Sequence, residues 1–259
     1  MLSNPSTPNS DGMAALKVSD GRRVAGVIFD WDGVLLDSLG ASFDVYNKIF
    51  QELGTKELTK DEFLQLQSPN WYEFYSRVGI PAGRWKYADD QWLRLYGEER
   101  PTLYPDAVGC VAELKASGFR LALVSNGSEV RVERELGRFG LASAFESVLC
   151  GRRKEELKPS PAMIERTLAA MGLGPKDVVY VGDAPADVQA SRNAGVTSVA
   201  IARNRILEGR LRAEKPDYVF GELGGVVELL VNKMVAGHRG GSDVAARLRP
   251  QGGQSLGHV

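Results

Sequence analysis

Two aspartates separated by one residue are the first feature of this sequence that could do chemistry. Asp30 and Asp32 follow the apolar run 24–29, and Gly33 comes directly after them. Carboxylates at the end of a buried strand are costly unless a cation or a reaction requires them. Side chains two residues apart in an extended chain point the same way, so both carboxylates could face one pocket. The alternative is a pair of aspartates that only form a turn before Gly33.

A second acidic pair lies far along the chain. Asp183 follows the apolar run 178–181 and Gly182, and Asp187 comes four residues later, beyond Pro185. Proline suits the first turn of a helix, and acidic residues near a helix N-terminus are favoured by the helix dipole alone. If the two acidic pairs converge, however, their oxygens form a hard-cation site suited to Mg²⁺.

Two further segments contain groups that could bind a phosphate. Ser125 and Asn126 follow the apolar run 119–124 and precede a helical pattern, where a hydroxyl and free backbone N–H groups can hold a phosphate oxygen or cap the helix. Lys158 ends the charged run 152–158, and most lysines in such runs are solvated. A site with several carboxylates and a phosphate dianion would nevertheless need one fixed cation.

The distribution of histidines excludes several kinds of enzyme. The chain has only two, His238 and His258, and both lie in its last 22 residues. Triads that depend on histidine, HExxH zinc sites and imidazole acid–base catalysis therefore lose their central residue. An enzyme built from the rest of the chain must use carboxylates, lysine, hydroxyls and a hard metal ion.

Short apolar runs alternate with helical patterns, which predicts an α/β fold with a doubly wound parallel sheet. In such a sheet the residue just past a strand's carboxyl end lies at the ligand-binding crevice, so Asp30, Ser125 and Asp183 should converge. The predicted strands are 24–29, 119–124, 178–181, 198–202 and 217–220, and the predicted helices are 105–117, 128–139, 161–171, 185–194 and 222–235.

Residues 37–105 interrupt this alternation with helical patterns and no convincing strand. The segment holds 13 of the chain's 21 aromatic residues, and Thr59 with Glu62 has the spacing of a capping box. We predict a helical cap domain inserted after the first strand, with extra helices packed on the sheet as the alternative. Its predicted helices are 40–53, 60–67, 70–78 and 84–97.

Length and composition set the remaining expectations. The 259 residues allow one catalytic core, 24–36 and 106–236, together with the cap and two flexible tails, 1–23 and 237–259. A net charge of −1 favours neither nucleic acid nor an anionic membrane as partner. The N-terminus has no apolar signal segment and the two cysteines form no disulfide framework, so we expect a cytoplasmic protein.

Taken in order, these motifs resemble those of the haloacid dehalogenase superfamily of aspartyl-nucleophile phosphohydrolases. The resemblance covers about residues 24–221 and rests on Asp30-x-Asp32-Gly33, Ser125, Lys158-Pro159, and Gly182-Asp183 with Asp187. A helical insert directly after the first motif is similar to the subgroup of phosphoglycolate phosphatase and β-phosphoglucomutase. It implies a Rossmann-like core and a small phosphorylated metabolite as substrate.

The resemblance also implies a role for each motif residue. Asp30 would be the nucleophile that forms an aspartyl-phosphate, and Asp32 the general acid and base. Ser125, with Asn126, would bind the phosphoryl group, and Lys158 would hold both nucleophile and phosphate. Asp183 would ligate Mg²⁺ with Asp30 and the backbone carbonyl of Asp32, and Asp187 would be a ligand or support for one.

The chain departs from the family pattern at two positions, and the family also contains proteins with other functions. Ala184 replaces a common serine, and Trp31 is bulky where smaller apolar residues are frequent. Asp32 argues against dehalogenases and phosphonate hydrolases, which lack an acid there. The phosphomutases carry a histidine in the cap hinge, whereas the insert here has none. A non-catalytic descendant that binds a phosphate ligand is the third alternative.

Overall fold

The computed structural model describes residues 16–17, 23–68 and 70–232. His238, His258 and most of the two predicted tails, 1–23 and 237–259, lie outside these ranges. One part of the predicted N-terminal tail does have regular structure, because β1 (Leu16–Lys17) pairs antiparallel with β2 (Arg23–Val24). Within the described ranges, no helix is both long and apolar enough to cross a membrane.

A six-stranded sheet in which every neighbouring pair is parallel forms the centre of the molecule and confirms the predicted α/β class. The strand order is β10-β9-β8-β3-β6-β7, so β3, which precedes the first aspartate pair, is an interior strand between β8 and β6. The strands are β3 (Gly26–Phe29), β6 (Arg120–Ser125), β7 (Ser147–Cys150), β8 (Val178–Gly182), β9 (Thr197–Ile201) and β10 (Tyr218–Phe220).

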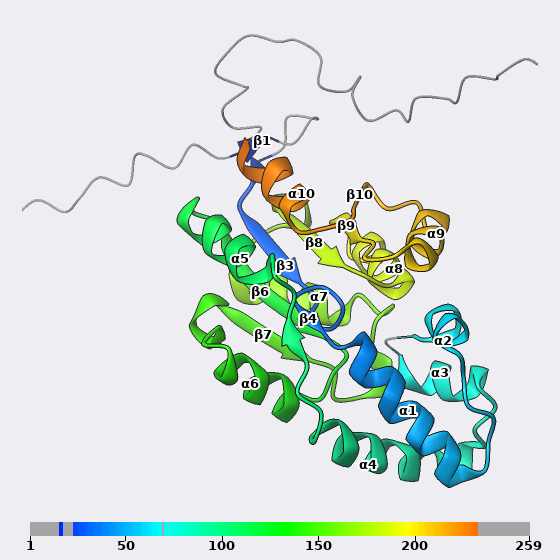
Figure 1. Ribbon diagram of the computed structural model, residues 1–259. Coiled ribbons are helices and arrows are strands. Elements are labelled where there is room, and N and C mark those ends of the chain that lie inside the picture. The colour runs from blue at the N-terminus through cyan, green and yellow to red at the C-terminus, as the bar shows by residue number, and fades with distance from the viewer. Residues whose placement is uncertain (1–15, 18–22, 69, 233–259) are drawn as a thin grey trace, which may run out of the picture.

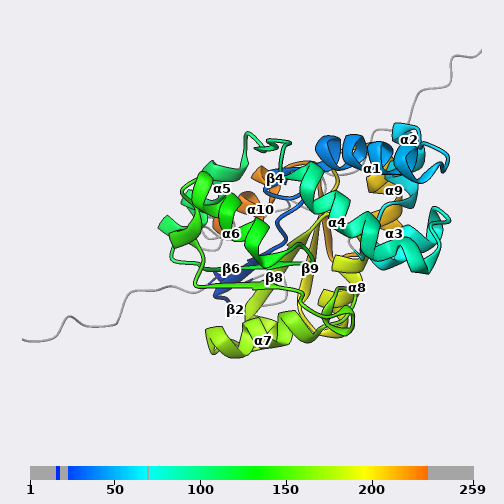
Figure 2. The same cartoon turned by 90° about the horizontal axis from the view of Figure 1, so that it is seen from below.

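Helices cover both faces of this sheet, as a doubly wound fold requires (Figures 1 and 2). Side chains of successive β3 residues lie on opposite faces of the sheet. Val27 and Phe29 pack in one apolar cluster, and Ile28 packs in the other. The first cluster takes in α5 (Ala107–Ala116), α6 (Glu129–Arg138) and α10 (Gly224–Val227), and the second takes in α7 (Ala162–Met171) and α8 (Pro185–Asn193).

Sequence periodicity missed two elements of the core. Strand β7 is an edge strand with three half-buried residues out of four, so its sequence lacks the apolar run of an interior strand. Helix α9 (Arg205–Ala213) is short and rich in arginine, and the Asn204 side chain caps it by accepting from the Leu207 N–H at 2.9 Å. Short 3₁₀ helices lie at Ala82–Arg84, Ala142–Ala144, Lys154–Glu156 and Pro175–Asp177. The chain after α10 continues as a short π-helix, Glu228–Asn232.

The insert is built from four helices with an apolar core of their own, beside the sheet in Figure 1. Thr59 and Glu62 form the predicted capping box at the start of the second helix. The expectation of no strand in 37–105 was wrong in detail, because β4 (Leu36–Asp37) pairs antiparallel with β5 (Thr102–Leu103) where the chain enters and leaves the insert. The helices are α1 (Leu39–Leu53), α2 (Lys60–Leu66), α3 (Trp71–Arg77) and α4 (Trp85–Tyr96).

The cap also contacts the core away from this two-stranded stem. Leu64 of α2 packs in an apolar cluster with Leu207 and Leu211 of α9. Arg210 of α9 donates to the carbonyl oxygens of Leu64, at 2.6 Å, and Gln67, at 2.9 Å. The end of α2 is therefore fixed to the core by both apolar and polar contacts.

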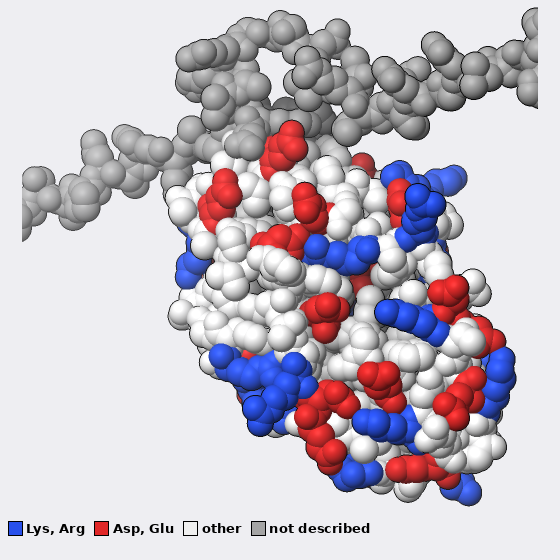
Figure 3. Space-filling model, in the orientation of Figure 1, with Lys and Arg blue, Asp and Glu red and all other residues white. Residues whose placement is uncertain are grey.

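Charged side chains of both signs are interspersed over the face of the molecule in Figure 3. Exposed charged side chains also pair with one another, such as Arg120 with Glu146 at 2.6 Å and Arg152 with Glu129 at 2.7 Å. Exposed pairs of this kind contribute little to stability, and a mixed surface produces no strong field of one sign.

Candidate active site

The carboxyl ends of three adjacent strands bring the predicted site residues together. Asp30 follows β3, Asp183 follows β8 on one side, and Ser125 ends β6 on the other. All three residues are buried, with exposed fractions of 5% or less, and all three line one cavity. The convergence follows from the parallel topology, since every such strand points its carboxyl end to the same edge.

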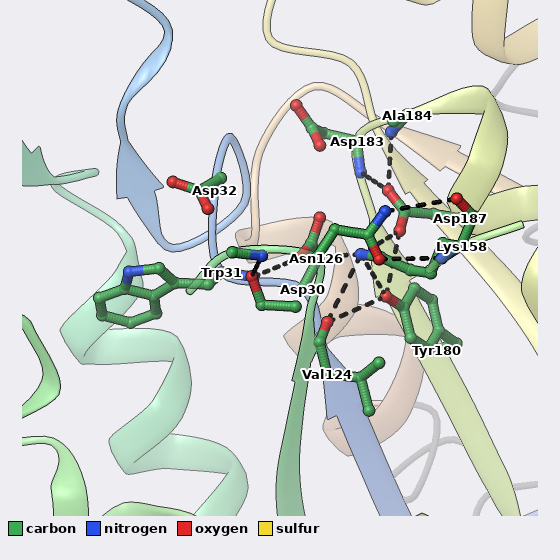
Figure 4. Close-up of polar contacts among 12 residues, drawn as sticks. Asp30, Trp31, Asp32, Val124, Asn126, Lys158, Tyr180, Asp183, Ala184 and Asp187 are labelled. Carbon is green, nitrogen blue, oxygen red and sulfur yellow. Dashed lines mark hydrogen bonds and ion pairs between the residues drawn. The ribbon is translucent and has the colours of Figure 1, made fainter. Parts of the chain in front are cut away.

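Lys158 lies beneath this edge as the cation of a buried ionic network (Figure 4). Its Nζ is 2.9 Å from Asp30 Oδ1 and 2.6 Å from Asp187 Oδ1, and its side chain is fully buried. It also donates to the Tyr180 hydroxyl at 3.0 Å. Burial alone would lower the pKa of Lys158, but the two carboxylates outweigh it and raise the pKa. Lys158 is thus a fixed positive charge against Asp30.

Asp187 uses both of its oxygens to hold this network in place. Oδ1 contacts Lys158 and accepts from the Tyr180 hydroxyl at 3.1 Å, while Oδ2 accepts from the backbone N–H groups of Asp183, at 3.2 Å, and Ala184, at 2.9 Å. The latter two bonds occupy donors at the start of α8, where a carboxylate is favoured. These contacts favour support of Lys158 and of the 183–184 turn over direct metal ligation.

Asp183 differs from its neighbours because its carboxylate has no hydrogen bond or ion pair among the described residues, although the residue is 5% exposed. Gly33 makes room for it: a Cβ at that position would lie 1.9 Å from Asp183 Oδ2, and the glycine φ of 76° disfavours other residues as well. The loop after Asp32 is therefore shaped around this carboxylate.

The carboxylates at this edge fit a hard metal ion. Asp30, Asp183 and Asp187 each offer an oxygen, and the three oxygens lie within 4.8 Å of one another. Burial raises the pKa of Asp183, with Asp187 and Asp30 adding to the shift. Burial also raises the pKa of Asp30 to about 7, against the opposing effect of Lys158. The three carboxylates offer oxygen ligands and negative charge, and the carboxylate of Asp183 has no other partner among the described residues. These properties suit Mg²⁺.

Asp32 lies apart from this group, as Figure 4 shows. It has a partner of its own, Arg131 on α6. Arg131 donates from Nη1 to Asp32 Oδ1 at 3.0 Å and from Nη2 to Oδ2 at 2.5 Å, which is the bidentate pairing of a guanidinium with a carboxylate. Burial opposes ionisation of Asp32, but Arg131 outweighs it and holds the pKa below its usual range. Asp32 is thus ionised and engaged in this arrangement.

The sequence prediction did not include Arg131. Its Nη1 also donates to Glu135 Oε2 at 3.0 Å, and the same oxygen accepts from Trp31 Nε1 at 2.7 Å. Trp31, singled out above as bulky, is fully buried and fixes Glu135. The detectable signal was an arginine and a glutamate four residues apart on the same helix face as Val132 and Leu136, which is the buried face of α6.

Ser125 and Asn126 hold the turn that follows β6. The Ser125 hydroxyl accepts from the Gly127 N–H at 2.9 Å. Asn126 binds the backbone of Lys158 at both ends of its amide, since Oδ1 accepts from the Lys158 N–H at 2.9 Å and Nδ2 donates to its carbonyl at 3.3 Å. Asn126 therefore couples the β6 turn to the lysine. Phosphoryl binding by Ser125 and Asn126 stays a prediction.

A cavity of about 280 Å³ lies between this edge of the sheet and the cap. The cap contributes mainly aromatic side chains to its wall, among them Tyr46, Phe63, Trp71, Phe74 and Trp92. Three cations of the cap, Arg77, Arg84 and Lys86, do not line it. Arg77 and Lys86 instead form surface pairs with Glu73, at 2.5 Å, and Asp90, at 2.7 Å.

Comparisons with known proteins agree with this arrangement of motifs. A family model described as haloacid dehalogenase-like hydrolase matches residues 27–201. A phosphoglycolate phosphatase from Aquifex aeolicus is 30% identical over 220 residues, which cover 81% of this chain and 98% of that protein. The pyrophosphatase PpaX from Bacillus velezensis is 25% identical over 215 residues, covering 80% and 97%. The crystal structure of a predicted phosphoglycolate phosphatase from Haemophilus somnus 129PT has a TM-score of 0.71 and 25% identity, and the match covers 80% and 97% of the two chains.

Proposed function

The chain belongs to the haloacid dehalogenase-like hydrolases, and from that premise we propose that it is a Mg²⁺-dependent phosphatase of small-molecule phosphate monoesters. The reaction would pass through an aspartyl-phosphate on Asp30, and the substrate would resemble phosphoglycolate in size. The observation that carries this proposal is the placement of Lys158 Nζ, 2.9 Å from Asp30 Oδ1 in a buried site that also holds Asp183 and Ser125.

Asp30 is well placed to act as a nucleophile. Its contacts among the described residues are on Oδ1, which accepts from the Trp31 N–H at 2.7 Å and faces Lys158. The other oxygen, Oδ2, is left to attack phosphorus while Lys158 offsets the repulsion between two anions. Ser125 ends β6, on the other side of β3 from β8 and Asp183, and its hydroxyl would hold a phosphoryl oxygen. Asp32 is ionised while it pairs with Arg131, so it would take up a proton from solvent on leaving Arg131 and give that proton to the ester oxygen as the P–O bond breaks.

The second half-reaction would reverse the role of Asp32. As a carboxylate it would take a proton from water, and the resulting hydroxide would attack phosphorus and release Asp30 and inorganic phosphate. Asp32 must exchange its contact with Arg131 for one with the ester oxygen or the water before either step.

Asp30 and Asp183 are the residues that would hold Mg²⁺, with the backbone carbonyl of Asp32 as a third ligand and Asp187 in support. The bound ion would neutralise charge on the phosphoryl group and on the attacking carboxylate. The partnerless carboxylate of Asp183 supports this assignment, because a buried carboxylate without a partner is costly.

The cap of residues 37–105 would provide selectivity among substrates. The motif residues of the core contact only what every phosphate ester has in common, whereas the aromatic wall of the cavity comes from the cap. Closure of the cap would also exclude water and favour small substrates over phosphoproteins.

The test is hydrolysis of p-nitrophenyl phosphate with Mg²⁺ by the wild-type protein and by Asp30→Asn. The amide keeps the shape of the side chain but has no anionic nucleophile, so kcat should fall by about 10⁴-fold or more while the protein stays folded. Wild-type-like turnover by Asp30→Asn would refute the assignment. Absence of any turnover by the wild type would favour the non-catalytic alternative.

A panel of phosphorylated metabolites would then separate a hydrolase from a phosphomutase. Release of inorganic phosphate from monoesters indicates the hydrolase, whereas transfer within a sugar phosphate indicates the mutase. The absence of histidine from the whole 37–105 insert supports the hydrolase.

A further inference from the structure

The cap contributes one charged side chain to the cavity among the residues described as lining it, Asp89 of α4. Trp92 and Leu93, three and four residues further along the helix, also line the cavity. Residues at this spacing share one face of a helix, so Asp89 lies on the face of α4 that borders the cavity. Asp89 is therefore placed to contact the part of a substrate that extends toward the cap.

Asp89 differs from the next residue in having no partner. Asp90 is exposed and pairs with Lys86 at 2.7 Å. Asp89 is half-buried, and within the described part of the chain no hydrogen bond or ion pair engages its carboxylate. Burial raises the pKa of Asp89, and the negative charge of Asp90 adds to the shift. A cation bound beside Asp89 would offset the cost of holding this carboxylate ionised away from water.

The aromatic wall of the cavity lies close to this carboxylate. Tyr46 belongs to the wall, with its ring centroid 4.7 Å from that of Phe74 and 6.1 Å from that of Trp92. Burial raises the pKa of Tyr46, and the negative charge of Asp89 adds to the shift. The face of an aromatic ring is negative and attracts a cation within about 6 Å, which is how proteins bind organic ammonium groups.

Negative charge predominates around the whole cavity. Of the charged residues described as lining it, four are aspartates and one, Arg131, is basic. Arg131 pairs with Asp32 at 2.5 Å and with Glu135 at 3.0 Å, so two carboxylates offset its charge. Asp89 lies on the cap side, away from the carboxylates that would hold Mg²⁺ at the sheet edge. The field there favours positive charge on the alcohol part of a substrate.

We propose that Asp89 and the aromatic wall form a subsite for a cationic amino group, and that phosphate esters of amino alcohols are the substrate class. This inference rests on the phosphatase function proposed above. Asp89 accepts a hydrogen bond from the ammonium of the substrate, and the rings of the wall attract its positive charge. Hydrolysis with one water then yields the amino alcohol and inorganic phosphate.

The geometry of α4 limits the length of the amino alcohol. Arg131 lies over the rings of Trp92, at 5.7 Å, and Tyr96, at 5.2 Å. It also pairs with Asp32, the residue proposed to protonate the ester oxygen. Asp89 comes one turn before Trp92 and two turns before Tyr96, which is about 5 to 10 Å along the helix. An ammonium two to four carbons from the ester oxygen, with one hydrogen bond to a carboxylate, spans about 6 to 9 Å.

The subsite also explains how other alcohols are disfavoured. A neutral alcohol fills the space but leaves Asp89 without a partner, so binding recovers none of the cost of its burial. An acidic alcohol brings a second negative charge toward Asp89, and like charges in a site of low dielectric repel. Discrimination therefore acts against both neutral and anionic leaving groups.

The experiment compares 2-aminoethyl phosphate with propyl phosphate, in which a methyl group replaces the ammonium at nearly the same size. With the wild-type protein, kcat/KM should favour the ammonium ester by about 10- to 100-fold, as expected for a charged hydrogen bond with a cation–π contribution. Asp89→Asn keeps the size of the side chain but loses its charge, and should lower that ratio about tenfold. Equal kcat/KM for the two esters with the wild type overturns the proposal.

Asp44→Asn is the matched control, since Asp44 is an exposed aspartate of α1 in the same cap and does not line the cavity. It removes the same charge and should keep the wild-type ratio. An equal fall of the ratio in Asp44→Asn would overturn the subsite. If Asp89→Asn lowers kcat/KM for both esters by the same factor, Asp89 is merely structural and the proposal is wrong. Circular dichroism establishes that each variant is folded.

Two further substitutions at this position vary the charge. Asp89→Glu keeps the carboxylate and should retain most of the preference for 2-aminoethyl phosphate. Asp89→Lys should reverse the preference, because an ammonium of the protein repels that of the substrate. Phosphoglycolate, which has a carboxylate in place of the ammonium at similar length, should be hydrolysed by the wild type with a lower kcat/KM than 2-aminoethyl phosphate. A wild-type preference for phosphoglycolate would overturn the proposal.

A binding measurement separates failure of this inference from failure of the phosphatase function. Calorimetric titration with 3-aminopropylphosphonate and butylphosphonate, in which a methylene replaces the ester oxygen, needs no turnover. The wild type should bind the ammonium form about 10-fold or more tightly, and Asp89→Asn should bind the two forms within a few-fold. If no ester is hydrolysed but this binding ratio holds, the phosphatase proposal fails and the subsite stands. If the esters are hydrolysed and neither ratio departs from 1, the subsite alone is refuted.

Discussion

The buried ionic network of the core and the aromatic interior of the cap differ in whether their buried polar groups have hydrogen-bond partners. In the core, Lys158, Asp187 and Tyr180 are fully or almost fully buried, and each is bonded to the other two. In the cap, the Tyr75 hydroxyl and the Trp92 indole N–H are buried without a partner among the described residues. Aromatic contacts dominate there instead, such as Tyr46 against Phe74 with ring centroids 4.7 Å apart.

The difference reflects two kinds of specificity. A closed network of charges fixes atoms to within a hydrogen-bond length, which a common phosphoryl reaction requires. Packed aromatic rings give shape and exclude water but hold no group at one defined position. Arg131 joins the two regions, because its guanidinium pairs with Asp32 of the core and lies over Trp92 and Tyr96 of the cap.

The largest loss of hydrolysis should follow from replacing Asp32, the carboxylate that pairs with Arg131. Asp32→Asn removes the acid and base, so hydrolysis of alkyl phosphates should fall by about 10³-fold. Formation of the covalent intermediate from p-nitrophenyl phosphate should fall much less, since that leaving group needs little protonation. Rapid-quench measurement of both formation rates checks this. Equal losses for the two leaving groups would remove Asp32 from the acid role.

Truncating a side chain of the aromatic cluster should destabilise the cap but leave phosphate hydrolysis by the core largely intact. Phe74 is 1% exposed, and Phe74→Ala should destabilise the cap by about 3 kcal/mol. Limited proteolysis of the insert should accelerate, and preferences among metabolites should flatten, while p-nitrophenyl phosphate hydrolysis should stay within about tenfold of the wild type. Tyr87→Ala on the exposed side of α4 is the control. Loss of all activity in a folded Phe74→Ala would show that the two regions are not separable in this way.

The core network should make Mg²⁺ binding depend on pH. The pKa of Asp30 is raised by burial from 3.8 to about 7, so the folded state favours the protonated form, and this contribution to stability is lost as the pH rises through 7. Mg²⁺ requires the ionised carboxylate, so its affinity should rise with pH through the range around 7 in which Asp30 ionises.

Thermal denaturation between pH 5 and 8, with and without Mg²⁺, checks this pH dependence. The stabilisation by Mg²⁺ should grow with pH, and Asp183→Asn should abolish most of it. A stabilisation that is the same at pH 5 and pH 8 would contradict the assignment of Asp30 as a ligand.

The smallest expected effect is the loss of one tyrosine hydroxyl, compared between the core and the cap. Tyr180→Phe removes a hydroxyl bonded to Lys158 and Asp187, and should cost about 1 kcal/mol of unfolding free energy together with a modest loss of kcat. Tyr75→Phe removes a buried hydroxyl without a described partner, and should be neutral or stabilising. Urea denaturation of both variants checks the pair. Equal destabilisation by Tyr180→Phe and Tyr75→Phe would show that the hydroxyls of the core and the cap contribute alike to stability.

The sequence by itself determined the local elements and the topology that joins them. Apolar runs ending at Asp30, Ser125 and Asp183 predicted three parallel strands with a common edge, and the structure has β3 between β6 and β8. Helical patterns within residues 37–105 predicted the four cap helices. These inferences succeed because strand burial and helix amphipathicity depend on neighbours a few residues apart. Edge strand β7 and arginine-rich α9 were missed because neither carries that pattern strongly.

Only the tertiary structure decided the partners of the charged side chains. Nothing local to Asp32 predicts that Arg131, 99 residues away, takes both of its oxygens. In the same way, Lys158 belongs to a charged run that predicts a solvated residue, yet packing makes it fully buried beside Asp30 and Asp187. The pairing of a charge depends on which side chains the fold brings within about 3 Å, and sequence spacing does not encode that distance.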